Sequence, residues 1–322
     1  MAANQKPNTP ALDGLYTNAL YYGDFSPNRV AAMADLRDRL SGFLVSDGAM
    51  GTQLFAQGLE GHCPEIWNVD RPDAIAGIHR AYLDAGSQII LTNTFGATEW
   101  KLDRSAHAAD QERLCRAAAE IALAAIEGRD AFVMGDVGPT GELPHPLGPR
   151  RITEFEAVFA TQIDLLAKAG VHGILIESMA NAQEAAAAIR AARRTCDLPV
   201  VGSVTYAAGK RGYRSMMGET VAQATRSLLD AEADVVGSNC GLGAGQMAEV
   251  IAEIKAVTDR PVWAKPNAGR PELIDGKTVF QEDAETWAAK VPAILEAGAN
   301  IVGGCCGTGP EHIARARQLI AK

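Results

Sequence analysis

From residue 43 onward the chain alternates between short apolar runs and longer stretches with helical spacing, and this alternation constrains its fold most. A loop rich in Gly, Asn or Pro follows most of the apolar runs. Eight such runs occur, at 43–46, 88–92, 131–135, 173–176, 199–204, 234–237, 261–264 and 300–302. Strands that alternate with helices predict a parallel sheet covered by helices.

Two architectures satisfy that alternation, an open doubly wound sheet and a closed barrel. Eight repeats in one domain-sized stretch favour an α/β fold of the (β/α)8 type, the TIM barrel, which typically takes about 250 residues. Residues 43–322 are therefore predicted to form the barrel. Residues 1–42 lie outside the repeat, and Ser26-Pro27 is a helix start signal. We expect an N-terminal extension with a helix over 26–40, packed on the barrel and plugging its amino-terminal end.

Several predicted helices carry recognisable ends. Residues 72–83 begin with proline and repeat apolar side chains at helical spacing. Thr153 and Glu156 have the spacing of a capping box, at the start of a helix that ends at Gly170. A further helix is predicted over 283–295.

The composition argues against several kinds of partner. The net charge is −9 and no Lys/Arg cluster stands out, so nucleic acid is not expected. The longest apolar runs are of strand length, so we expect no membrane span. The first residues lack the apolar segment of a secretory signal, which favours a cytoplasmic protein. Assembly into a homo-oligomer stays open.

Three cysteines follow predicted strands at the same rim. Cys240 comes after the sixth strand, and Cys305 and Cys306 come after the eighth, next to glycines. Reactive residues of such barrels lie at the carboxyl ends of strands, so these sulfurs can converge. Three thiolates suit a soft or borderline metal, most commonly zinc, and leave the fourth position of a catalytic site open. The remaining cysteines are predicted to be packing residues: Cys63, Cys115 and Cys196.

A zinc ion with an open position would bind a thiol substrate. A free thiol has a pKa of about 8.5, whereas a metal-bound thiol is deprotonated, and the thiolate is the nucleophile. This predicts an enzyme that activates sulfur for attack on a methyl group. Three alternatives stay open: a redox enzyme using Cys305 and Cys306 as a dithiol, a non-catalytic zinc- or thiol-binding barrel, and a barrel that binds phosphate at its Gly-rich loops.

Four segments together resemble the homocysteine S-methyltransferase family: DGAMGT at 47–52, TNTF at 92–95, Asn239-Cys240, and GGCCGT at 303–308. That family includes betaine–homocysteine methyltransferases and the homocysteine module of cobalamin-dependent methionine synthase. The resemblance covers roughly residues 42–320 and implies a (β/α)8 barrel that methylates homocysteine.

The resemblance also implies roles for individual residues. Zinc would be held by Cys240, Cys305 and Cys306. The amino-acid end of homocysteine would lie near the first-strand Asp47-Gly48 and the fourth-strand Glu177, the two acidic groups serving as catalytic residues. Further substrate contacts are expected at Thr94 and Asn239.

The methyl donor is the least constrained part of the prediction. A quaternary ammonium donor such as glycine betaine is expected to bind in an aromatic cage. Candidates for that cage are Trp67, Phe95, Trp100, Tyr206 and Trp263. Animal betaine-using relatives carry tyrosines where this chain has Gly96 and Ser178. Betaine or a similar onium compound is the first choice, with S-methylmethionine or a methyl-corrinoid on a separate corrinoid protein as alternatives.

Overall fold

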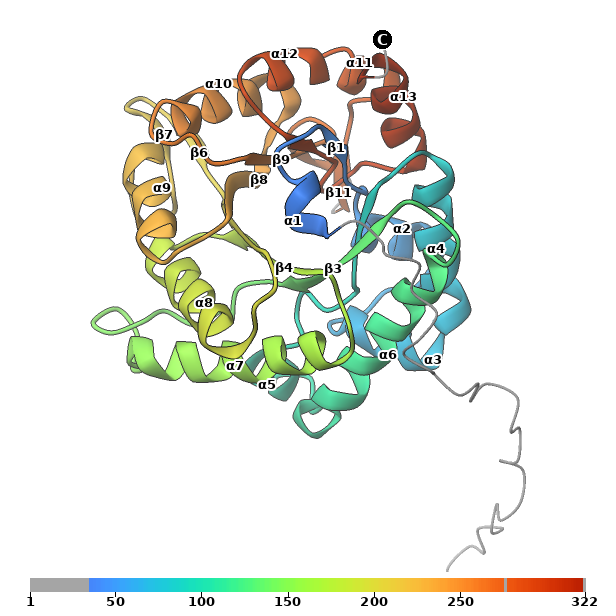
Figure 1. Ribbon diagram of the computed structural model, residues 1–322, viewed down its shortest axis with the longest axis vertical. Helices are drawn as coiled ribbons and strands as arrows, with labels where there is room; N and C mark the ends of the chain where they lie inside the picture. The colour runs from blue at the N-terminus through green and yellow to red at the C-terminus, as the bar shows by residue number, and fades with distance from the viewer. Residues whose placement is uncertain (1–34, 275–276, 321–322) are drawn as a thin grey trace, which may run out of the picture. The chain divides into compact units, whose positions relative to one another are not determined.

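Eight parallel strands form a barrel, and helices surround it (Figure 1). The computed structural model describes residues 35–274 and 277–320. The barrel strands are β1 (Leu44–Val45), β2 (Ile89–Leu91), β3 (Phe132–Val137), β4 (Gly173–Met179), β5 (Val200–Val204), β8 (Val235–Gly243), β9 (Val262–Asn267) and β12 (Ile301–Val302). Each coincides with one of the eight predicted runs, so the predicted fold is confirmed.

The sheet closes on itself between β1 and β2. Its hydrogen-bonded neighbours follow the order β1-β12-β9-β8-β5-β4-β3-β2. A parallel bridge pairs Ser46 with Ile89, and Gln88 N donates to Val45 O at 2.7 Å. Both ends of the sheet are thereby paired, and the carboxyl ends of all eight strands point to one mouth.

Helices connect the strands on the outside. They are α2 (Met50–Ala56), α3 (Trp67–Asp70), α4 (Pro72–Asp84), α5 (Glu99–Asp103), α6 (Gln111–Ala125), α7 (Ile152–Lys168), α8 (Ala182–Thr195), α9 (Val221–Asp230), α10 (Ala244–Lys255), α11 (Ala284–Ala288), α12 (Val291–Glu296) and α13 (Pro310–Ile320), with the 3-10 turns η1 (Pro64–Ile66) and η2 (Ala108–Asp110). Two hairpins follow β5 and β9: β6 (Ala207–Gly209) with β7 (Gly212–Arg214), and β10 (Pro271–Ile274) with β11 (Lys277–Phe280). In the described ranges no helix combines the length and apolarity needed to cross a bilayer.

The predicted helix ends are right in part. Helix α4 matches the prediction, and α7 stops before Gly170, whose φ of +91° suits glycine. The predicted capping box is wrong by two residues: Glu154 accepts from Arg151 N at 2.8 Å, so α7 begins before Thr153. An arginine is an unusual N-cap residue, which is why the sequence favoured the threonine.

The helix predicted over 283–295 is broken into α11 and α12. Pro292 lies in the first turn of α12, where its missing N–H costs no hydrogen bond. A continuous helix would place its ring against the carbonyl of Ala288. The chain therefore ends one helix at Ala288 and starts another at Val291.

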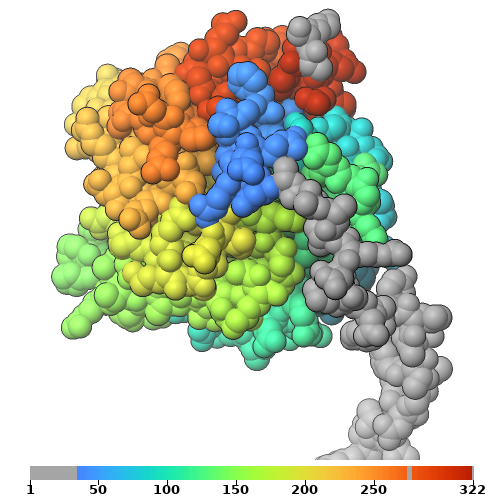
Figure 2. All heavy atoms as spheres, viewed as in Figure 1, coloured from blue at the N-terminus to red at the C-terminus, as the bar shows by residue number. Residues whose placement is uncertain are grey.

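The amino-terminal half of the barrel interior is filled with apolar side chains. Strand residues such as Phe132, Leu175 and Trp263 form one buried cluster there, together with Leu36 and Leu40. Leu36 belongs to the short helix α1 (Leu36–Arg39), which lies over the centre of the face seen in Figures 1 and 2. The described end of the extension thus packs where the sequence predicted it. Most of the predicted 26–40 helix lies outside the described residues, and the domain boundary at 42/43 stays a prediction.

Candidate metal and substrate site

A cavity of about 840 Å³ opens at the carboxyl-terminal mouth of the barrel. Its walls come from the carboxyl-terminal parts of β3, β4, β8 and β9, from the segments that follow β1, β2 and β12, and from the β10–β11 hairpin. Six of the eight predicted site residues line it, namely Asp47, Gly48, Glu177, Cys240, Cys305 and Cys306. Thr94 and Asn239 are fully buried and lie behind the lining.

The three predicted cysteines come together. Their sulfurs all lie within 4.8 Å of one another, and Cys240 Sγ is 3.9 Å from Cys306 Sγ. Tetrahedral zinc with Zn–S bonds of about 2.3 Å places its sulfur ligands about 3.8 Å apart. The donor set and its spacing therefore fit a zinc ion with one position left for substrate. This is the sole potential metal-binding group of Cys, His, Asp and Glu within 35–274 and 277–320.

Unusual backbone geometry turns Cys240 into the cavity. The pairing of β8 with β9 shifts register between Asn239 and Gly243, and Cys240 has a φ of +61°. A non-glycine residue in this left-handed region costs free energy, and such residues concentrate at functional sites. Gly241 follows with a φ of +69°, and its missing side chain leaves room for Tyr206 O, 2.7 Å from an added Cβ.

Backbone hydrogen bonds fix the loop that carries the other two cysteines. Cys305 N donates to Pro266 O at 2.8 Å, and Cys306 O accepts from Ala268 N at 2.9 Å. Thr308 Oγ1 donates to Cys305 O at 2.7 Å. Both cysteines are thus tied to the end of β9, which lies next to β8 and its Cys240.

The sulfur cluster favours a negative charge on Cys240. Hydrogen bonds from Cys305 and Cys306 lower the pKa of Cys240, so the cluster itself holds a thiolate. Asn239 Nδ2 lies 3.9 Å from Cys305 Sγ and offers a further N–H. By contrast, burial raises the pKa of Cys63 to about 11, and burial also raises the pKa of Cys196. Negative charge within the cluster is therefore placed on Cys240, whose hydrogen bonds in turn raise the pKa of Cys305 and Cys306.

Glu177 is held beside the sulfurs by Asn239. Its Oε2 accepts from Asn239 Nδ2 at 3.3 Å, while Asn239 Oδ1 accepts from Ser178 N and Ser203 Oγ at 2.8 and 2.6 Å. Burial raises the pKa of Glu177 to about 7, although the charge of Lys265 opposes that rise. Ser178, with a φ of +57°, lies at the register shift of β4 and directs this segment into the cavity.

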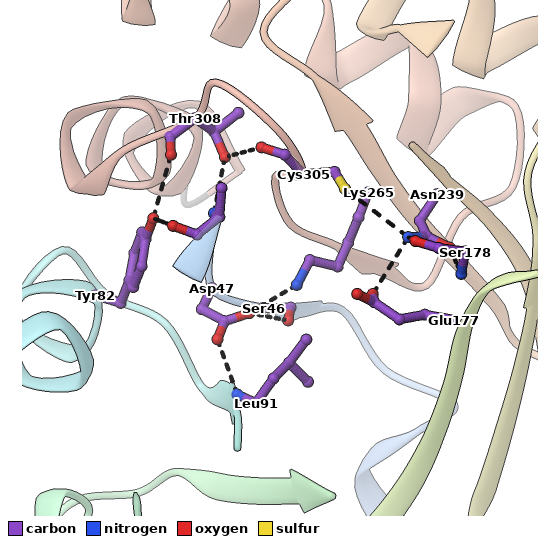
Figure 3. A network of polar contacts seen from close by, with 11 residues as sticks. Ser46, Asp47, Tyr82, Leu91, Glu177, Ser178, Asn239, Lys265, Cys305 and Thr308 are labelled. Atoms are coloured by element: carbon purple, nitrogen blue, oxygen red, sulfur yellow. Dashed lines mark hydrogen bonds and ion pairs between the residues drawn. The ribbon is translucent and has the colours of Figure 1, made fainter. Parts of the chain in front are cut away.

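Asp47 forms a buried ion pair that the sequence analysis did not foresee. Its Oδ1 lies 2.8 Å from Lys265 Nζ and also accepts from Ser46 Oγ, and its Oδ2 accepts from Leu91 N at 2.8 Å (Figure 3). The Lys265 and Asp47 side chains are 3% and 5% exposed. The sequence did contain a signal for this ion pair: Lys265 ends an otherwise apolar strand run, and a buried lysine needs an acidic partner.

Asp136 is an acidic residue of the site that the sequence did not predict. It is the penultimate residue of the buried strand β3, lines the cavity and is 6% exposed. Its Oδ1 has no hydrogen-bond partner among the described residues, and burial raises its pKa well above the ordinary value. The cavity wall therefore contains four buried carboxyl groups, those of Asp47, Glu65, Asp136 and Glu177, and one buried ammonium group, that of Lys265.

Gly48 lies at the surface of the cavity, whereas Thr94 is buried beneath it. A Cβ at Gly48 would lie 2.8 Å from Thr308 Oγ1 and from Tyr82 Oη, so only glycine fits between the cavity and these side chains. Thr94 Oγ1 donates to Asp136 O at 2.7 Å and is 2.6 Å from Thr92 Oγ1. The Thr94 hydroxyl is used in these hydrogen bonds beneath the cavity, which favours a role in supporting the cavity wall. The predicted contact between Thr94 and substrate stays a prediction.

Fold and site together define an enzyme of the barrel type, with thiols at metal-ligand spacing in a cavity at the carboxyl ends of the strands. Residues 44–320 match the family model described as homocysteine S-methyltransferase, and the chain belongs to that family of methyltransferases.

Two curated relatives are methionine synthases. That of Mycobacterium tuberculosis is 32% identical over 307 residues, covering 89% of this chain and 25% of the relative. That of Mycobacterium leprae is 30% identical over 298 residues, covering 87% and 24%. The chain thus spans about a quarter of the length of these proteins.

Solved structures support the fold independently. The metallated form of the homocysteine methyltransferase MmuM from Escherichia coli gives a TM-score of 0.73 at 23% identity, covering 89% of this chain and 100% of that one. Its apo form gives 0.68 at 22% identity, with 89% and 98% covered.

Proposed function

We propose that this chain transfers a methyl group to the thiol of homocysteine, giving methionine, with zinc held by Cys240, Cys305 and Cys306. One observation carries the proposal: three sulfurs from two separate strand ends meet at metal-ligand spacing beside buried acidic groups. Membership of the family and similarity to methionine synthases support homocysteine as the acceptor.

Zinc bound by three cysteines would supply an open position at which a substrate thiol is ionised near neutral pH. The protein side chains would position the rest of the substrate. Asp47 and Glu177 bring negative charge to the place where the substrate ammonium enters, and Asn239 keeps Glu177 aimed there. Gly48 leaves the adjoining edge of the cavity open. The substrate sulfur then forms the new S–CH3 bond, and the donor departs with the electron pair of the broken bond.

The donor is proposed to be glycine betaine or a similar onium compound. Of the five aromatic residues predicted as a cage, only Phe95 lines the cavity, and Phe55 and Phe280 are the other phenylalanines there. Three phenylalanine rings in a cavity with buried acidic groups suit a methylated cation, which would leave as a neutral amine. A tyrosine in place of Gly96 would collide with Glu65, whose Oε1 lies 2.6 Å from an added Cβ. A tyrosine at that position would therefore require Glu65 to move.

The metal assignment is tested by replacing the cysteines one at a time. Cys240→Ser, Cys305→Ser and Cys306→Ser should each lose zinc, measured by metal analysis of purified protein, and methionine formation should fall to background. Cys196→Ser is the matched control, because Cys196 is a half-buried cysteine outside the cavity lining. Full zinc occupancy in any of the three variants would rule out that ligand.

The donor is tested by a panel assay. Zinc-loaded protein is incubated with homocysteine and, separately, with betaine, S-methylmethionine, other onium compounds or methylcobalamin, and methionine is measured by mass spectrometry. Methionine from betaine or another onium donor is the expected result. Turnover with methylcobalamin alone would favour a separate corrinoid protein as donor. Zinc and homocysteine binding without turnover of any donor would identify a non-catalytic member of the family.

A further inference from the structure

Lys101 is a second lysine of the cavity wall, and it lies beside one of the phenylalanine rings. It belongs to α5, and its side chain is partly exposed at the cavity. Its Nζ lies 4.5 Å from the centroid of the Phe95 ring, which is cation–π distance. The ring is held in turn by Gly138, because a Cβ at Gly138 would lie 2.5 Å from Phe95 Cδ2. These contacts fix the direction of the Lys101 ammonium group.

No acidic side chain among the described residues forms an ion pair or hydrogen bond with Lys101. Glu65 attracts it most strongly, but Glu65 Oε1 accepts from Gly96 N at 2.5 Å and Oε2 accepts from Cys63 Sγ at 3.5 Å. Burial therefore outweighs the attraction and lowers the pKa of Lys101. A bound anion would oppose this effect, since an opposite charge favours the ammonium form. By contrast, Lys265 is already paired with Asp47.

The position of this lysine conflicts with a donor that carries only positive charge. A methylated cation on the phenylalanine rings would lie near the Lys101 ammonium group, and like charges repel. A carboxylate on the donor removes the conflict, because it can accept hydrogen bonds from Lys101 while the methylated end contacts the rings. Glycine betaine has this form, with its carboxylate one carbon atom away from the nitrogen.

We propose that Lys101 binds the carboxylate of the methyl donor, so that the site selects onium donors that are also carboxylates. Phe95 then has two roles, since it is half-buried at the cavity, where a donor can contact it, and also supports Lys101. The inference rests on the proposed function, because it requires an onium donor in this cavity. It narrows that class to donors such as glycine betaine and S-methylmethionine.

Two analogues of glycine betaine separate the charges of the donor. The carboxylate is kept in 3,3-dimethylbutyrate, where a neutral carbon replaces the nitrogen. Choline keeps the cation and has a hydroxyl group in place of the carboxylate. Both are titrated calorimetrically into zinc-loaded protein in the presence of homocysteine. Lys101→Met should raise the Kd of 3,3-dimethylbutyrate about 10-fold or more, the weight of a hydrogen bond between charged groups. The Kd of choline should change less than about 3-fold or fall, because a like charge is removed.

Steady-state kinetics give a second measurement with the reacting donor. Lys101→Met should raise the KM of glycine betaine about 10-fold or more with little change in kcat, because the carboxylate takes no part in the bonds that form and break. Lys101→Arg keeps the charge and should restore most of the affinity for both carboxylates. Lys168→Met is the matched control, since Lys168 is an exposed lysine of α7 outside the cavity lining, and it should behave as wild type.

The outcomes separate this inference from the proposed function. Equal changes in the Kd of 3,3-dimethylbutyrate and choline in Lys101→Met, at unchanged zinc content, would overturn the inference and leave homocysteine methylation standing. Wild-type turnover of choline or trimethylsulfonium as efficient as that of glycine betaine would do the same, and so would turnover with methylcobalamin alone. Failure of the zinc-loaded wild type to form methionine from any donor would overturn the proposed function itself.

Discussion

At the scale of single residues, the site contains backbone conformations and buried ionisable groups that each cost free energy of folding. Cys240 and Ser178 have left-handed backbone conformations, and Glu177, Asp136 and Lys265 are ionisable groups buried at the cavity. Such states persist only where surrounding contacts determine them. Here those contacts are the Asn239 hydrogen bonds and the Lys265–Asp47 pair.

The raised pKa of Glu177 should make stability depend on pH. Its pKa is about 7 in the folded chain against 4.5 as the ordinary value. An acid with a raised pKa contributes stability that is complete below pH 4.5 and is lost as pH rises through 7. Relative to wild type, Glu177→Gln should therefore gain up to about 3 kcal/mol between pH 4.5 and 7.5.

Urea unfolding of both proteins with zinc removed measures this difference. Glu127→Gln, an exposed glutamate replaced in the same way, is the control and should follow wild type at every pH. A constant difference between Glu177→Gln and wild type across this range would show that Glu177 is not desolvated as described.

At the scale of elements, the sequence predicted the bounds of helix α4 but not the destabilising effect of a histidine on its buried face. Its apolar face contains Ile75, Ile78 and Tyr82, all buried, and also His79. Neither ring nitrogen of His79 has a partner in the described part of the chain, and burial lowers the pKa of His79 to about 4. The helix therefore packs a neutral, unsatisfied imidazole against the barrel.

Replacing that imidazole should stabilise the protein. His79→Leu should raise the free energy of unfolding by about 1–3 kcal/mol at pH 7, because an unsatisfied buried polar group is removed. A base with a lowered pKa gives stability that is present above pH 6.5 and lost as pH falls toward 4. The advantage of the variant should therefore grow between pH 7 and pH 5 in urea unfolding. A destabilised variant, or an advantage that shrinks on acidification, would contradict this reading.

At the scale of the whole molecule, the proposed zinc would join the ends of β8 and β12 across the strand between them. A ligand that binds only the folded chain stabilises it by mass action, by about 4 kcal/mol at a thousandfold excess over Kd. In the unfolded chain Cys240 is far from the adjacent Cys305 and Cys306, so metal binding and folding should be coupled.

Thermal unfolding tests that coupling. Zinc added to chelator-treated wild type should raise Tm by about 5–10 °C at a thousandfold excess over Kd. Cys305→Ser should lose this rise, since two sulfurs leave the site incomplete. An equal rise in Cys305→Ser and wild type would place the bound zinc elsewhere.

The sequence by itself determined the barrel and the metal-type cluster. Eight apolar runs that alternate with helices are compatible with few topologies, and a closed barrel is one of them. Because the carboxyl ends of all barrel strands lie at one rim, the order of the elements was enough to predict that Cys240 lies near Cys305. Glycines around the cysteines marked the same rim.

Only the tertiary structure decided which charges meet inside the mouth. The partners Lys265 and Asp47 are 218 positions apart, and Asn239 supports Glu177 from another strand. The physical reason is that a hydrogen bond depends on ångström distances between side chains, which periodicity along the chain does not encode. Secondary-structure patterns fix which end of a strand a residue occupies, whereas packing of the closed barrel fixes what each side chain touches.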